Sequence, residues 1–130
     1  MLHVAFAARN GCSRVVVHAS DTDVIVLCMY HLSKIPGFQE LWIWKSANEF
    51  IRVHVIAEML DPAFVNALPA IHAISGCDTT KRGQKSAVLA VKQDMSLCQG
   101  LAMLAPDGVP IAPVMSDEAY GTAQRLVLKM

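Results

Sequence analysis

Short apolar runs typical of strands alternate with longer runs typical of helices along this chain. Residues 1–9 are good helix formers that end at Asn10-Gly11, a pair expected where a helix terminates. They are apolar nearly all round, which predicts a covered helix. The β-branched run 15–19 lies between turn residues, and this pattern predicts an interior parallel strand with both faces buried.

The next segment has two interpretations. Val24 to Leu27 have strand propensity, but Ser20 and Asp21 are good N-caps and the apolar run extends to Leu32. We therefore expect a helix here. Residues 41–44 and 51–55 then predict two extended segments around a turn, followed by a short helix over 56–60.

The second half of the chain has helical periodicity. We expect a helix over 61–76, which Pro69 should kink or split. Further helices are expected over 84–93, over 95–105 and from Ser116 onward. An irregular connector is expected at Pro106, Gly108, Pro110 and Pro113. Strands that alternate with helices predict an α/β layered fold with a helical C-terminal part.

Composition limits the classes of function. The chain has 130 residues, is 54% hydrophobic and carries 11 basic and 11 acidic side chains. This composition predicts a folded domain without a strong net electrostatic field. Any nucleic-acid contact must therefore be local. Four widely spaced cysteines predict buried thiols, and no apolar run is long enough to span a membrane. We expect a soluble intracellular protein, nuclear or cytoplasmic.

Two carboxylates, Asp21 and Asp23, follow the first predicted strand directly. Open α/β sheets place ligands outside the carboxyl ends of their strands, and Mg²⁺ takes carboxylate oxygens, so the pair is a candidate metal site. The other interpretation is a helix cap followed by a solvated acidic side chain, and a D-x-D motif alone favours it. Gly76-Cys77-Asp78 could bring a third carboxylate, or could form a helix end and an Asx turn.

A basic glycine turn precedes the helix expected over 84–93. Lys81, Arg82, Gly83, Lys85 and Ser86 could form a phosphate-binding corner at a helix N-terminus, or a solvated surface turn. The five histidines have no ligand spacing and are assigned structural roles. Trp42 and Trp44 alternate along a strand, which is more typical of a core or an interface than of a base-stacking platform.

Taken in order, the segments VVVHASDTDV, ELWIW, ALPAIHAISGCDTT and RGQKSA resemble the flap-endonuclease and PIN-like nuclease superfamily. They look closest to a group of uncharacterised animal proteins of that type. The resemblance covers roughly residues 1–92. It implies a parallel-sheet core and a divalent-metal-dependent phosphodiesterase activity. The metal, Mg²⁺ or Mn²⁺, would be bound by Asp21, Asp23 and Asp78. The resemblance also implies DNA contacts at Arg82, Gly83, Lys85 and Ser86.

The chain departs from the family at its N-terminus. Where the family has an acidic cluster opening a helix, this sequence has Met1-Leu2-His3-Val4, and the earlier strand with a further Asp has no counterpart. The departure implies a partial nuclease-like domain over 1–94, incomplete as a catalyst, with a helical extension over 95–130. The alternative is a non-catalytic remnant or binding module. An incomplete sheet also predicts self-association through uncovered apolar surface at Val4, Phe6 and Ala7.

Overall fold

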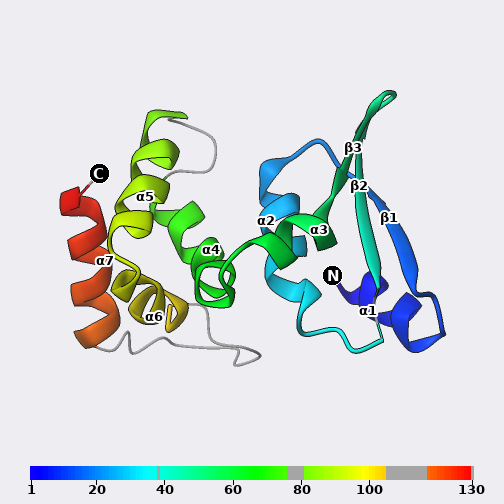
Figure 1. The fold of residues 1–130 in the computed structure, drawn as a ribbon, viewed down its shortest axis with the longest axis horizontal. Coiled ribbons are helices and arrows are strands. Elements are labelled where there is room, and N and C mark those ends of the chain that lie inside the picture. The colour runs from blue at the N-terminus through cyan, green and yellow to red at the C-terminus, as the bar shows by residue number, and fades with distance from the viewer. Residues whose placement is uncertain (38, 76–80, 105–116, 130) are drawn as a thin grey trace. The chain divides into compact units, whose positions relative to one another are not determined.

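The structure, a computed structural model, describes residues 1–37, 39–75, 81–104 and 117–129 (Figure 1). The chain divides into two compact units, residues 1–65 and residues 66–130. Seven helices and one three-stranded sheet are present in the described part, so the α/β class is confirmed. The predicted division at residue 94 concerned the extent of a nuclease-like domain, and it stays a prediction.

The sheet of the first unit is mixed. It consists of β1 (Arg14–His18), β2 (Glu40–Ser46) and β3 (Glu49–Arg52), in the order β1-β2-β3. β1 and β2 are parallel, whereas β2 and β3 form an antiparallel hairpin. The parallel part of the prediction therefore holds for one pair of strands only, because the short turn after Ser46 allows only an antiparallel return.

Three helices of the first unit pack on one side of this sheet (Figure 1). They are α1 (Leu2–Arg9), α2 (Thr22–Leu32) and α3 (Val53–Met59). Leu41 and Ile43 of β2 point to this side and are fully buried. The helix expected from Asp21 is confirmed, because burial of its apolar residues Cys28, Met29 and Tyr30 outweighs the strand propensity at its start.

Two predictions of complete burial are wrong. Val4 is the one buried residue of α1, whereas Phe6 is 69% exposed, so a helix that is apolar all round contacts the rest of the unit on one side only. The uncovered apolar surface predicted for this helix is therefore present at Phe6 and absent at Val4. β1 also has an exposed face, because the helices cover only the opposite face of the sheet. Val16, in the middle of β1, is 53% exposed.

The second extended segment of the sequence is shorter than predicted. β3 ends at Arg52, and α3 begins at Val53 instead of Ile56. Val53 is fully buried as the first residue of α3. Burial in this environment overrides the β propensity of residues 53–55, as tertiary contacts commonly do.

Helix α4 (Pro62–Ser75) runs through Pro69 as one helix, so the segment is not split in two, and the alternative of a kink at Pro69 stays a prediction. Proline removes one backbone hydrogen bond from a helix interior. Buried residues precede and follow Pro69, namely Val65, Ala67, Ala70 and Ile71, and their burial holds both halves of the helix in place. Pro62 occupies the first helical position after Asp61, as predicted.

The second unit begins within α4, at Asn66, and contains α5 (Lys81–Gln93), α6 (Ser96–Ala102) and α7 (Asp117–Lys129). Helix α7 packs on both α5 and α6. The core of the unit includes Val91, Leu97, Leu101 and Leu126. The three helices confirm the periodicity of the sequence. The predicted connector at residues 106–113 lies outside the described residues. Within the described part, no helix is long and apolar enough to cross a membrane.

Candidate functional site

Asp21 and Asp23 lie where the predicted metal site requires them, after the carboxyl end of β1. β1 ends at His18, and the parallel pairing with β2 continues through a hydrogen bond from Ala19 N to Trp44 O of 3.1 Å. Asp21 is the N-cap of α2, and its Oδ1 accepts a hydrogen bond from Asp23 N at 3.0 Å. Asp21 is exposed and Asp23 is half-buried. The capping interpretation is therefore realised, and it uses only one oxygen of Asp21.

Asp61 provides an internal comparison for this cap. Its Oδ1 accepts a hydrogen bond from Ala63 N at 2.8 Å, the same bond to the second following residue that Asp21 makes. Position 63 is alanine, so the cap does not need a carboxylate there. Asp23 lies in the first turn of α2, where a carboxylate interacts favourably with the positive end of the helix dipole.

The third predicted ligand, Asp78, lies outside the described residues, together with Gly76 and Cys77. Among the residues that the structure describes, no group of three or more His, Cys, Asp or Glu side chains could hold a metal ion. The structure therefore places two of the three predicted ligands on one turn. Two carboxylates separated by one residue still fit Mg²⁺, which binds one or two carboxylates and keeps several waters.

The predicted basic glycine turn is helical. α5 begins at Lys81, so Gly83 lies in its first turn rather than before it. A helical glycine costs only about 1 kcal/mol relative to alanine, which the burial of Ala87, Ala90 and Val91 on α5 outweighs. The side chains of Lys81, Arg82 and Gln84 lie outside the described part. Lys85 is exposed and Ser86 is half-buried.

A second feature, the open face of the sheet, was missed by sequence reasoning. The strand register places three rows of side chains across this face, Arg14 beside Glu40, then Val16–Trp42–Arg52, then His18–Trp44–Phe50. Trp44 is 40% exposed and Phe50 is 53% exposed. A shallow depression of about 410 Å³ lies on the same face, lined by Arg14, Val16, Glu40, Trp42 and Phe50. The alternation of Trp42 and Trp44 had indicated a core or an interface, and the exposure of Trp44 shows that the described residues do not bury this face.

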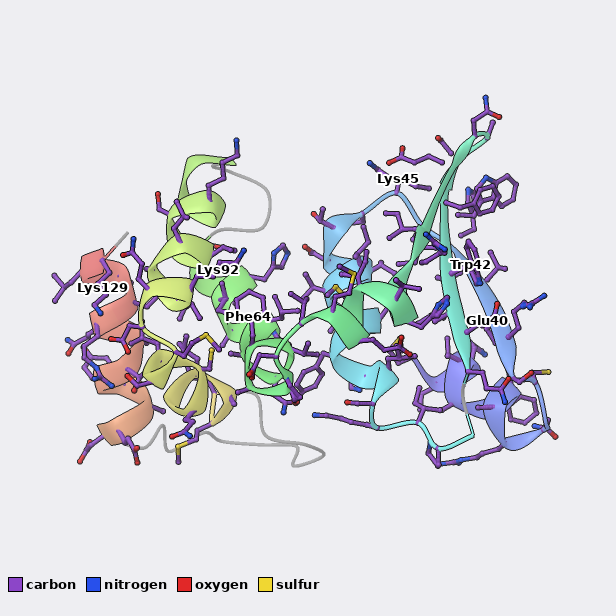
Figure 2. All side chains as sticks on the ribbon, viewed as in Figure 1. Glu40, Trp42, Lys45, Phe64, Lys92 and Lys129 are labelled. Atoms are coloured by element: carbon purple, nitrogen blue, oxygen red, sulfur yellow. The ribbon has the colours of Figure 1, made fainter. Side chains whose placement is uncertain are left out.

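A small polar network occupies one end of the open face. Arg14 donates from Nε and Nη2 to Glu40 at 2.7 and 2.8 Å, and Trp42 Nε1 donates to Glu40 Oε2 at 3.0 Å. Figure 2 labels Glu40 and Trp42 on β2. The hydrogen bonds from Arg14 and then from Trp42 lower the pKa of the Glu40 carboxyl from 4.5 to about 2. The same pair raises the pKa of Arg14. This network fixes the orientation of the Trp42 ring.

Other predicted assignments are partly confirmed. Cys28 and Cys98 are buried thiols, and burial raises the pKa of Cys28. Cys12 is exposed, because it lies in the turn between α1 and β1, and Cys77 lies outside the described residues. His54 Nδ1 lies 3.0 Å from Leu41 O, a contact that joins α3 to β2 and agrees with a structural role.

Comparison with known proteins does not identify a family. The chain significantly matches no protein-family model, no curated protein and no solved structure. The assignment of a function therefore rests on the residues described above.

Proposed function

We propose that the chain forms part of a divalent-metal-dependent, nuclease-like domain that acts on nucleic acid, with Asp21 and Asp23 as ligands of Mg²⁺ or Mn²⁺. One observation carries the proposal, namely that both carboxylates follow the carboxyl end of β1, which pairs in parallel with β2. That end of a parallel pair is where open α/β sheets bind ligands. The PIN-like and flap-endonuclease-like character of the fold belongs to this proposal.

The donor set suits the chemistry. A hard divalent ion bound by carboxylates can lower the pKa of a bound water and hold a phosphate oxygen during phosphodiester cleavage. Asp21 keeps Oδ2 outside its cap, and Asp23 brings a second carboxylate to the same turn. Asp78 is the third proposed ligand, and catalysis needs a fuller set of carboxylates than the two on this turn.

Lys81, Arg82 and Lys85 are proposed to contact a nucleic-acid backbone at the start of α5, with Gly83 and Ser86 beside them. Phosphate contacts by Lys and Arg make binding depend on salt, because counterions are released. We expect replacement of Lys81, Arg82 and Lys85 by Ala to abolish salt-dependent binding of duplex DNA, measured by fluorescence anisotropy. Unchanged binding and an unchanged salt slope would dismiss this contact.

The second candidate is a non-catalytic binding module. It is favoured by the hydrogen bond that already engages Asp21 as a helix cap, and by the uncovered aromatic face of the sheet. In that case the two carboxylates only stabilise the start of α2. The two candidates differ in whether Asp21 and Asp23 bind a cation.

Isothermal titration with Mg²⁺ and with Mn²⁺ separates them. The test variant is Asp21→Asn with Asp23→Asn, because Asn caps a helix about as well as Asp but carries no charge. The control is Asp61→Asn, which alters the equivalent cap of α4. We expect binding by the wild type and the control and none by the double variant. A wild type that is folded by circular dichroism and binds neither ion would contradict the proposal.

A further inference from the structure

The row His18–Trp44–Phe50 crosses all three strands of the open sheet face. The ring centroids of His18 and Trp44 are 4.6 Å apart, and the planes are tilted by 38°. Trp44 and Phe50 have nearly parallel rings, 10° apart in plane with centroids 6.2 Å apart. All three side chains are exposed. The row is thus a cluster of three neighbouring, exposed aromatic rings on the strands of the sheet.

Its position along the strands matters for the chemistry. His18 is the last residue of β1, so the row lies at the carboxyl end of the parallel pair, and Asp21 follows within one short connection. The aromatic surface and the candidate metal ligands therefore belong to the same end of the sheet.

The charges that accompany the row favour an anion. Arg52 stands in the neighbouring row opposite Trp42, and it is exposed. Arg14 adds a second cation two rows away, where Glu40 compensates it. Glu40 is the one acidic residue in these three rows, so the rows themselves carry one net positive charge, whereas the whole chain is neutral.

We propose that this row binds unpaired bases of a single-stranded nucleic acid, with the sugar-phosphate backbone passing Arg52. Exposed aromatic rings on a sheet stack on bases of any sequence, and an adjacent cation holds the phosphates. A duplex keeps its base faces inside the stack and cannot use such a surface. The inference rests on the proposed function in naming a single strand as the substrate, but the stacking itself needs no metal.

The test uses fluorescein-labelled 12-mer oligo(dT) and a 12-base-pair duplex, measured by anisotropy in EDTA at low salt. We expect the full chain to bind the single strand more tightly than the duplex. Trp44→Ala and Phe50→Ala should each weaken binding about 5- to 150-fold, the range for loss of one base–aromatic stack. Tyr120→Ala, which removes a comparably exposed ring from α7, should leave it unchanged.

Trp44→Phe keeps a ring on the face and distinguishes lost stacking from lost folding, because it should recover most of the affinity that Trp44→Ala loses. Absence of oligo(dT) binding, equal binding by Trp44→Ala and the wild type, or a preference for the duplex would overturn the inference. So would a dimer on gel filtration that Trp44→Ala abolishes while no oligonucleotide binds.

The outcomes for the two proposals are separable. Binding of oligo(dT) in EDTA, without any calorimetric metal binding, would retain the stacking row and reject the metal site. Metal binding lost in the Asp21→Asn, Asp23→Asn variant, without any oligonucleotide binding, would do the reverse.

Discussion

Glu40 gives the clearest prediction at the level of single residues. Its carboxyl is hydrogen-bonded by Arg14 and Trp42, which lowers its pKa from 4.5 to about 2. A carboxyl with a depressed pKa in the folded state stabilises the protein fully above the unfolded value, and this contribution is lost as the pH falls toward the folded value. The sensitive window is therefore pH 4.5 down to about 2.

We expect Glu40→Gln to reduce the pH dependence of the melting temperature within that window. Glu58→Gln, which alters an exposed carboxylate on α3, should melt with the same pH dependence as the wild type. Thermal unfolding followed by circular dichroism from pH 5 to pH 2.5 measures both. Parallel curves for Glu40→Gln and the wild type would show that the Arg14–Glu40 pair does not form in solution.

The sequence predicted local features of single residues better than distant pairings. The N-cap roles of Asp21 and Asp61 and the turn at Gly11, which has φ of 85°, follow from neighbouring residues. The Arg14–Glu40 pair joins residues 26 positions apart, so no local pattern signals it. The spacing of Asp21 and Asp23 indicated a ligand pair, but it left open whether the carboxylates cap a helix or bind a cation.

At the level of elements, the contact between α6 and α7 depends on Gly100. A Cβ at this position would lie 2.7 Å from Thr122 Cβ and 2.8 Å from Thr122 Cγ2. Thr122 cannot easily turn away, because its Oγ1 donates to Glu118 O at 2.8 Å and accepts from Arg125 Nη2 at 3.3 Å. At Gly121, on α7, a Cβ would have no heavy atom within 4 Å apart from its chain neighbours and the backbone of its own helix.

The two glycines should respond to alanine in opposite directions. Gly100→Ala should lower the free energy of unfolding by about 1–2 kcal/mol, since overpacking exceeds the gain in helix propensity. Gly121→Ala should raise it by about 0.5–1 kcal/mol, because only the propensity changes. Urea unfolding measures both. A stabilising Gly100→Ala would mean that α6 and α7 do not pack this closely.

The types of the elements followed from periodicity, whereas their environments did not. The helices of both units appear where apolar residues recur at helical spacing, and the β2–β3 hairpin appears where two β-rich runs flank a short turn. Apolar content alone could not show that β1 and the Trp44 face of β2 are uncovered. That depends on which side of the sheet the helices occupy, and α1, α2 and α3 all occupy the same side.

For the molecule as a whole, two kinds of exposed apolar surface keep self-association as a prediction. One is the open sheet face next to the edge strand β1, since an uncovered edge can pair with another chain. The other is the stripe Tyr120, Ala123, Val127 and Leu128 on α7, which borders a depression of about 490 Å³. A net charge of zero adds no repulsion between copies.

The central claim is a divalent-cation site after β1, and Mn²⁺ broadening of amide signals in a ¹H–¹⁵N correlation spectrum locates such a site directly. The proposal requires the amide signals around Asp21 and Asp23 to broaden first at substoichiometric Mn²⁺. Signals around Asp78 should broaden with them if Asp78 completes the site. The Asp21→Asn, Asp23→Asn variant should lose this effect. First broadening at Asp117 and Glu118, the other acidic helix start, or at no defined position, would contradict the claim.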